Sequence, residues 1–512
     1  MPELGELRAT VDDARKALAE ARWDDALRLL DGCEMWPIEV AEHAVLIKAD
    51  TITRRDAGDA LAWLSSTDDI VASDEARFQR ELLTGRAYAN ARNFDSAAAR
   101  YERARRLADR VPGGPARLAY HLARLRWLRR SGTAEGPDVA LSLTNPDPTG
   151  RAAAYAIRGW LHASAGNFAL QIADLRTALE IVQASDHTCD VGTVSSIVFA
   201  LARVAFETAD QEGVEAARRA YEYLRWTDCT RVDQFQTVRS LGMDAFVRGD
   251  IVRAQWLFRD AILFAPSPAW QALAHLDRAL VAQFAGNDAW ALDEIESAVK
   301  LAQGVAWGDT RGEERFALVN LAVRLAPIDI GRAQRYAATF SRLGLQNITP
   351  MHGATSDVRT VGYEKHAFGT IEHMLGNKDL ATSSLVEAYN VFAIINYHFQ
   401  AMRCAQALAE ITGDEMWTER ARGHIAHYPG SQLMRDGASM VKKRDPVVDE
   451  LTPFQLRLAR AHWAGSDVGE LSRQFSRSSY TIEHQIQAIY EAFNVRSATG
   501  LREVARQRGL LA

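Results

Sequence analysis

Near the end of the chain, polar side chains recur at the spacing of a single helical face. They are Tyr480, Glu483, His484, Gln487 and Glu491. Positions three and four apart lie on the same side of an α-helix. The amide of Gln487 can bond to N6 and N7 of adenine, and the carboxylate of Glu483 can accept from N4 of cytosine. This face therefore has the chemistry to read base edges in a DNA groove.

The opposite side of the same segment is apolar. Its members follow an i, i+4, i+7, i+11 pattern: Ile482, Ile486, Ile489 and Phe493. That periodicity predicts a helix over 478–493, with Ser478 as its N-cap. We expect the apolar side to pack against Leu471 and Phe475, so that the polar side faces outward.

Three further helices are expected around it. Thr452 and Gln455 form a capping-box pattern for a helix that ends at Gly465. Asp467 is expected to cap a short helix over 468–475, and a fourth helix should start at Ser497 or Thr499 and end at Gly509. Two short helices joined by a tight turn are typical of a helix-turn-helix.

The segment 451–512 resembles the LuxR-type helix-turn-helix family of bacterial transcription regulators. The match is gapless and runs through Leu451-Thr452-Pro453, Gly465, Glu470-Leu471-Ser472, Phe475, Ser478, Thr481-Ile482-Glu483-His484, Ile489-Tyr490, Phe493, Val495-Arg496-Ser497, Thr499 and Leu501. The resemblance implies a four-helix domain that binds double-stranded DNA, with phosphate contacts from Ser478, Tyr480, Thr481 and Arg496. It also implies pairing through the last helix, hence a homodimer, and names RNA polymerase as a further candidate partner.

The rest of the chain repeats a spacing of small and large residues. In one copy Gly85 is followed by Ala97, Tyr101 and Ala104; in another, Gly242 is followed by Ala254, Phe258 and Ala261. The same frame fits around Ala14, Gly159, Ala279 and Gly369. A small residue lets two antiparallel helices approach, and the large residue fills the space beside it. The Gly-Asn and Gly-Asp pairs between them should end one helix and cap the next.

This pattern resembles the tetratricopeptide family over about residues 8–428. We expect about ten steps of roughly 40 residues, longer than the regular unit of about 34. The stretches Arg130–Thr149 and Leu343–Glu364 fit worst. A generic all-α solenoid with coincidental alanine spacing is the alternative. The predicted fold is all-α: a tetratricopeptide-like α-solenoid over 1–429, a linker over 430–450 and a four-helix LuxR-type domain over 451–512.

In the tetratricopeptide family the first helix of each unit lines a concave groove. By that analogy, the groove-facing positions here are Trp160, Met243, Phe246, Gln283, Phe284, His366, His373 and Met374. Such a lining suits a peptide, a small apolar molecule or a protein partner. An equally weighted alternative is that a tightly wound superhelix fills its own groove.

Composition limits the remaining function classes. The chain has 47 % hydrophobic and 25 % charged residues, which excludes extensive disorder. Four dispersed cysteines form no disulfide framework or zinc module. The segment 451–512 carries eight arginines against five acidic residues, whereas the whole chain has a net charge of −6. A basic segment on an acidic body points to a polyanionic partner for that segment alone.

Signals for enzymes and membranes are missing. The sequence holds no GxxxxGK[ST], GxSxG, HExxH or GxGxxG motif, so we expect no catalytic site and no cofactor. Metal ligation by the pairs His424 with His427 or His187 with Cys189 is the less favoured alternative to ordinary packing or solvation. No run of about 18 apolar residues occurs, and the N-terminus lacks a signal-peptide pattern, so a cytoplasmic location without membrane contact is expected.

The sequence therefore predicts a bacterial, sequence-specific DNA-binding transcription regulator whose repeat array senses a peptide, small molecule or protein. The alternative is a non-catalytic scaffold or co-regulator that acts through protein contacts, with a helix-turn-helix that does not read DNA.

Overall fold

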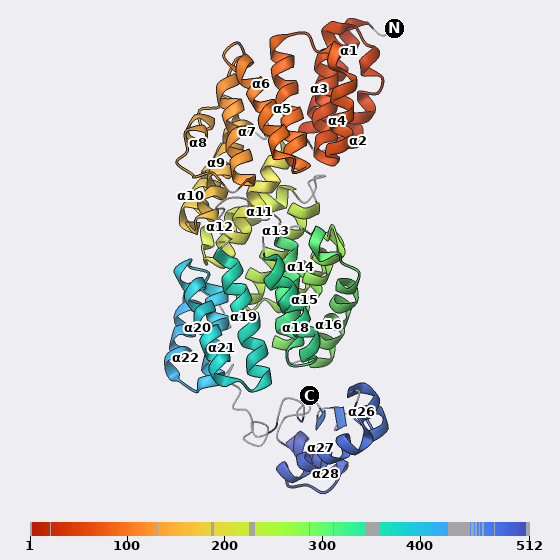
Figure 1. The fold of residues 1–512 in the computed structure, drawn as a ribbon, viewed down its shortest axis with the longest axis vertical. Helices are drawn as coiled ribbons and strands as arrows, with labels where there is room; N and C mark the ends of the chain where they lie inside the picture. Colours follow the sequence, from red (N-terminus) through yellow and green to blue (C-terminus); the bar gives the residue numbers. More distant parts are fainter. Residues whose placement is uncertain are drawn as a thin grey trace.

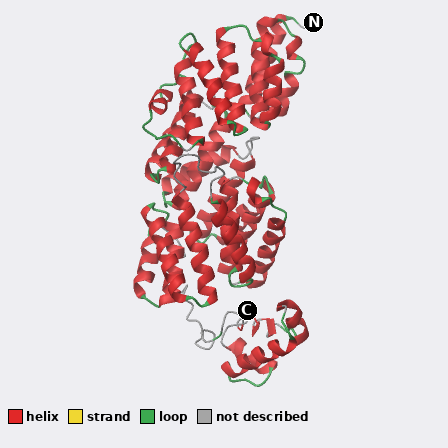
Figure 2. Cartoon of the chain, in the orientation of Figure 1, coloured by secondary structure: helices red, strands yellow, loops and turns green. Residues whose placement is uncertain are grey.

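The structure is a computed structural model, and its described residues are helices joined by loops, turns and short 3-10 segments, with no strand among them (Figures 1 and 2). It describes the chain except for residues 1–2, 21, 130, 186–188, 225–230, 286, 311, 345–357, 429–450, 452–454, 456–457, 460, 463–464, 476 and 508–512. The predicted linker over 430–450 and the Thr452 cap lie outside the described residues. The all-α fold class is confirmed.

Helices α1 to α22 form eleven consecutive hairpins within the described part of the array. The first five are α1 (Leu4–Ala19) with α2 (Trp23–Leu29), α3 (Ile38–Arg55) with α4 (Ala57–Ser66), α5 (Asp74–Asn90) with α6 (Phe94–Ala108), α7 (Gly114–Leu128) with α8 (Pro137–Ser142), and α9 (Pro148–Ser164) with α10 (Phe168–Ala184). The poorly fitting stretch Arg130–Thr149 holds the short α8, which explains its deviation from the repeat.

Six further hairpins complete the array. They are α11 (Val191–Glu207) with α12 (Gln211–Leu224), α13 (Arg231–Val247) with α14 (Ile251–Phe264), α15 (Pro268–Phe284) with α16 (Asp288–Gln303), α17 (Phe316–Leu325) with α18 (Ile330–Leu343), α19 (Val358–Leu375) with α20 (Lys378–Ile394), and α21 (His398–Thr412) with α22 (Glu415–Ile425). About ten steps were expected, so the repeat count is close. The second poorly fitting stretch lies largely outside the described residues.

The small residues of the repeat pattern stand where helices touch. A Cβ atom on Gly85 would lie 2.3 Å from the ring of Tyr101, and one on Gly242 would lie 2.8 Å from the ring of Phe258. Both rings are buried. Each glycine therefore admits the large residue of the following helix, as the spacing predicted, and the hairpins stack because neither helix buries its apolar face alone.

The turn glycines adopt the conformation that ends a helix. Gly166, Gly249 and Gly376 have φ values of 81°, 82° and 86°, in the left-handed region that glycine tolerates best. The capping prediction holds for Asp250 and Asn287, whose side chains accept from backbone amides of the next helix. It is wrong for Asn167 and Asn377, which make no side-chain cap. The Asn377 amide donates instead to the Glu372 carboxylate, at 2.6 Å.

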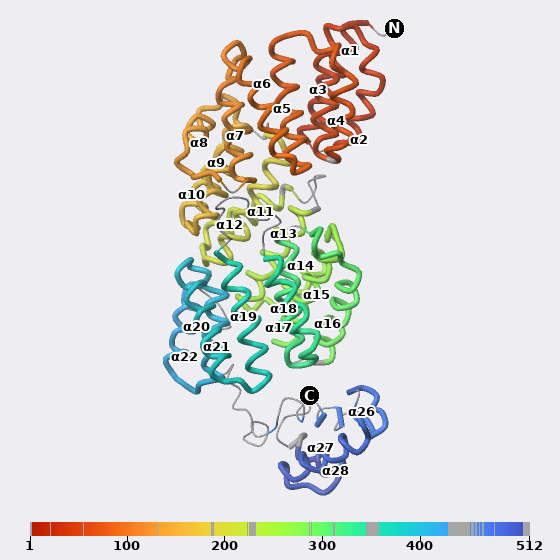
Figure 3. The backbone as a smooth tube through the Cα atoms, in the orientation of Figure 1, coloured from red at the N-terminus to blue at the C-terminus, as the bar shows by residue number. Residues whose placement is uncertain are grey.

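The array winds until its last helices reach its middle (Figure 3). The ring of Phe168, at the start of α10, lies 4.8 Å from the ring of Tyr397, just before α21. The Tyr428 hydroxyl donates to the Phe206 carbonyl of α11, at 2.9 Å. The helices from α11 to α21 therefore close around a shared interior, which no single hairpin would enclose.

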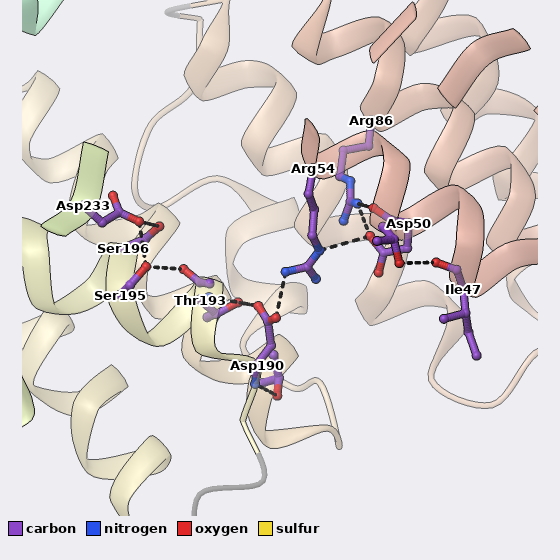
Figure 4. A network of polar contacts seen from close by, with 12 residues as sticks. Ile47, Asp50, Arg54, Arg86, Asp190, Thr193, Ser195, Ser196 and Asp233 are labelled. Atoms are coloured by element: carbon purple, nitrogen blue, oxygen red, sulfur yellow. Dashed lines mark hydrogen bonds and ion pairs between the residues drawn. The ribbon is translucent and has the colours of Figure 1, made fainter. Parts of the chain in front are cut away.

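A second long-range contact joins the first helices to the same region. Figure 4 shows Arg54 of α3 between Asp50 and Asp190, with Nη1 2.7 Å from the Asp190 carboxylate. Asp190 is also the N-cap of α11 and accepts from the Thr193 amide. Burial alone would raise the pKa of Asp50, but the guanidinium groups of Arg86 and Arg54 outweigh this effect and lower it. This network anchors the start of α11 to the N-terminal hairpins.

The C-terminal segment 451–512, called the tail below, contains α26 (Val468–Phe475), α27 (Ser479–Ala492) and α28 (Ala498–Gln507). These bounds agree with the predicted helices, although the residues after Gln507 lie outside the description. Asp467 and Ser478 cap α26 and α27 as expected, and Ser497 accepts from the Gly500 amide, so it opens α28 rather than Thr499. Leu458, Leu471, Leu501 and the apolar side of α27 form one buried cluster.

Candidate functional site

The polar face of α27 is exposed along its length. Ile482, Ile486 and Ile489 occupy the buried side of the helix, which fixes its rotation about its own axis. The predicted DNA-contacting residues consequently all lie on the exposed surface: Ser478, Tyr480, Thr481, Glu483, His484, Gln487 and Arg496. Tyr480 has 77 % of its surface exposed.

Two side-chain contacts organise this face. The Ser478 and Thr481 hydroxyls lie 2.8 Å apart at the first turn, where backbone amides and the helix dipole favour an anion. Further along, the Gln487 amide donates to the Glu491 carboxylate at 3.2 Å. That bond leaves the Gln487 carbonyl and one N–H available. The arrangement can present a phosphate-binding turn and, about two turns later, an amide suited to a base edge.

The predicted groove residues divide into two groups. Met243 and His366 line a pocket inside the array. The other positions pack elsewhere: Trp160 against Trp127, Phe246 against Phe284, and Gln283 as acceptor for Arg324. His373 and Met374 are partly buried. Much of the expected apolar lining is thus filled by neighbouring side chains.

The pocket is built from the first helices of six successive hairpins. These are α11, α13, α15, α17, α19 and α21, which Figure 3 places between the middle of the array and its lower end. Aromatic walls come from Phe316, Tyr363, Tyr397 and Phe399. The cavity volume is about 40 Å³, which is room for a few water molecules or one small polar group.

Charged residues that the groove prediction missed dominate this pocket. Arg239 forms two hydrogen bonds with Asp277, at 2.5 and 3.2 Å. The Glu313 carboxylate bridges Arg203 and Arg359, at 2.5 and 3.0 Å. These residues sit on the first helices, or just before one, at positions that a periodicity search treats as part of the core. Only their convergence from separate hairpins reveals the cluster.

Two partly buried arginines near the centre are paired differently. Arg403 reaches the Gln400 carbonyl at 3.5 Å, and Arg324 reaches the Gln283 carbonyl at 2.7 Å. Within the described part of the chain, neither guanidinium forms an ion pair. Burial lowers the pKa of Arg403, and burial with the nearby Arg403 charge lowers the pKa of Arg324 to about 9. The same two cations add to burial in lowering the pKa of His366.

Glu207 faces these cations from the end of α11. Its Oε1 accepts from the Gln400 amide at 3.4 Å, while its buried Oε2 has no hydrogen-bond partner among the described residues. Burial raises the pKa of Glu207 to about 7, although the hydrogen bond from Gln400 and the nearby arginines oppose that shift. The carboxyl can therefore exist in either protonation state near neutral pH.

A histidine cluster lies where the array ends. The Nδ1 atoms of His398 and His424 are 3.0 Å apart, and His427 stacks on His398 with ring centroids 3.8 Å apart. His424 also contacts the Tyr389 hydroxyl at 3.2 Å. Burial lowers the pKa of His398 to about 4 and lowers that of His424. The described residues hold no group arranged to ligate a metal ion.

The sequence matches no family model and no curated protein. Within the described residues, no helix has the length and apolar character needed to cross a bilayer.

Solved structures with distant similarity are helical proteins. The apo form of the quorum sensor NprR from B. thuringiensis shares 13 % identity at a TM-score of 0.40, covering 80 % of this chain and 99 % of that one. A Rap protein complexed with competence and sporulation factor shares 13 % identity at a TM-score of 0.46, covering 72 % of this chain and 100 % of that one. The APC/C hetero-tetramer Cut9-Hcn1 also shares 13 % identity, with a TM-score of 0.32 and coverage of 98 % and 90 %. At this distance the similarity assigns no function.

Proposed function

We propose that the chain is a sequence-specific DNA-binding transcription regulator, with α27 as the element that reads DNA and the array as a sensor. The observation that carries the proposal is the exposed polar face of α27 on a helix whose other side is buried. The resemblance of segment 451–512 to LuxR-type regulators supports the same role. The proposed role is non-catalytic.

Charge supports a nucleic-acid partner for the tail. Its arginines outnumber its acidic residues, whereas the whole chain is acidic. Exposed arginines lie on both sides of α27 in the sequence: Arg473 and Arg477 before it, Arg496 and Arg502 after it. Guanidinium groups release condensed counterions when they neutralise phosphates, so binding should weaken as salt rises.

The test is a binding series against fragments selected from the native genome. Gln487→Ala should cost about 1–3 kcal/mol on the preferred site and relax the preference at one base position. Gln303→Ala, the same substitution at an exposed position of the array, is the control and should leave binding unchanged. Equal affinity of Gln487→Ala and the parent across all sequences would remove the base-reading role from Gln487.

The second candidate function is a scaffold or co-regulator that acts through protein contacts alone. It predicts no selective retention of genomic fragments, and no difference between a preferred and a scrambled duplex at any salt concentration. Selective binding that falls as salt rises would exclude it.

Pairing through α28 is part of the proposal. Leu501 points into the tail core, whereas Val504 is partly exposed, which leaves one edge of the helix for a second copy. Two-fold symmetry then requires two half-sites about one DNA turn apart. Mass measurement with a palindromic duplex should show two chains per duplex, and one chain at saturating protein would refute the dimer.

A further inference from the structure

The pocket of the array holds more positive than negative charge. Its lining includes Arg203, Arg239, Arg359 and Arg403, but only two carboxylates, Glu207 and Asp277. Asp277 is committed to Arg239, and Glu313 behind the lining serves Arg203 and Arg359. Arg403 is the lining guanidinium that makes no ion pair within the described part of the chain.

A guanidinium that is partly removed from water and has no counter-ion is costly. It cannot easily lose its proton, and transfer from water to a low-dielectric interior penalises the charge unless an anion compensates it. The contacts that Arg403 does make are weak. Its bond to the Gln400 carbonyl is 3.5 Å long, and Gln400 in turn reaches Glu207 at only 3.4 Å. The hydrogen bonds that link Glu207, Gln400 and Arg403 are therefore long, and a better acceptor could replace Gln400 at Arg403.

The surroundings of Arg403 match a planar acid. Its guanidinium lies 6.0 Å from the ring of Phe399, and Phe316 and Tyr363 form a further aromatic pair at 4.9 Å. His366 lines the pocket and is held neutral by its surroundings. The short apolar end of a small acid could lie against these walls while its carboxylate meets Arg403.

We infer that the pocket binds a small monocarboxylate of the size of acetate, with the carboxylate at Arg403. This inference rests on the proposed sensor function and names the ligand class of that sensor. A planar guanidinium matches a carboxylate in a two-bond arrangement, which gives strength and direction.

A monoanion fits better than a phosphate dianion. One lining guanidinium lacks an ion pair, so one negative charge balances it. The unpartnered Oε2 of Glu207 lies in the same pocket, where its negative form would repel a dianion more strongly. In its protonated form Glu207 can donate a hydrogen bond to the bound carboxylate.

The experiment measures binding to the full chain by calorimetry and by the shift in melting temperature. The probes are acetate and propionate, the neutral amide acetamide, and inorganic phosphate. We expect acetate or propionate to bind at millimolar concentration and acetamide to fail.

Arg403→Met tests the assigned contact. It keeps a side chain of similar length, so the parent fold should remain, and removal of an unpaired, partly buried charge should raise the melting temperature of the free protein. Affinity for the carboxylate probe should fall by about 30-fold or more. Arg420→Met, on the exposed side of α22, is the matched control and should keep parental affinity.

The outcomes separate this inference from the proposed function. Failure of every carboxylate probe, equal binding of acid and amide, tighter binding of phosphate, or parental affinity in Arg403→Met would each overturn the carboxylate site. DNA selection by the same preparation is unaffected by those results. Carboxylate binding without any selective DNA binding would instead overturn the regulator and leave the pocket standing.

Discussion

The exposed face of α27 and the arginine pocket of the array are built over different distances along the chain. The face belongs to one helix of 14 residues, and its Gln487–Glu491 bond spans one helical turn. The pocket draws on six helices, and its Glu207–Gln400 bond joins residues 193 positions apart. A site on one helix depends on that helix and on the small core that it packs against, whereas the pocket depends on every hairpin between α11 and α21.

The largest expected effect breaks the tail and spares the array. Ile482→Ala removes a fully buried side chain from α27 and should destabilise the tail by about 4 kcal/mol. The tail has only a small core, so DNA binding should disappear while the array melts as in the parent. Gel shift and thermal melting of the full chain measure the two properties.

Gln474→Ala is the control, because Gln474 is exposed on α26 and its loss should leave the tail folded. If Ile482→Ala also lowered the melting temperature of the array, the two regions would not be independent folding units.

The next largest expected effect is on the array, with the tail left intact. Gly242→Ala places a Cβ atom 2.8 Å from the buried ring of Phe258, which should destabilise the array by about 2–3 kcal/mol. Because α13 carries Gln236, Arg239 and Met243 of the pocket, binding of the carboxylate probe should weaken while DNA selectivity remains. Urea unfolding and calorimetry provide the measurements.

Gly423 supplies a matched position, since a Cβ atom there meets nothing within 4 Å. Gly423→Ala should stabilise α22 by about 0.5–1 kcal/mol through helix propensity. A loss of stability equal to that of Gly242→Ala would show that close helix approach is not the reason for Gly242.

A third effect concerns pH. Burial raises the pKa of Glu207 from 4.5 to about 7 in the folded chain, so the folded state holds a proton that the unfolded state has lost between those values. Stability from this group is therefore lost as pH rises from about 4.5 to 7. Glu207→Gln should be more stable than the parent by about 2 kcal/mol at pH 8 and should show little difference near pH 4.

His398 acts in the opposite direction over a similar range. Its folded pKa of about 4 lies below the ordinary 6.5, so its contribution is lost as pH falls from about 6.5 to 4. The difference between Glu207→Gln and the parent isolates the carboxyl, because both proteins retain His398. A pH-independent difference would contradict the assigned protonation.

The smallest effect concerns the exposed edge of the tail. Arg496→Ala should weaken binding to all DNA sequences similarly and lower the salt dependence by about one counterion. Titrations at several salt concentrations measure this slope, and Arg420→Ala in the array should leave it unchanged. An unaltered slope in Arg496→Ala would assign Arg496 a structural role.

Local patterns were enough for the helices and their contacts. The i+16 pairs Gly85 with Tyr101 and Gly242 with Phe258 predicted where hairpins touch, because a Cβ atom would collide there. The rotation of α27 followed from its isoleucines, and the cap at Ser478 from the residue itself. The capping rule failed at Asn377, whose amide found Glu372 on the preceding helix, a competitor that a local rule does not include.

The amino-acid sequence by itself determined that the chain is helical, where the tail helices α26 to α28 lie, and which side of α27 is exposed, since these depend on neighbours within a few turns. Only the tertiary structure decided that Arg403, Glu207 and His366 share a pocket and that Phe246 and Phe284 fill each other's space. Small rotations between successive hairpins add up along the array. Which side chains finally meet therefore depends on the summed path of six hairpins, which no local spacing encodes.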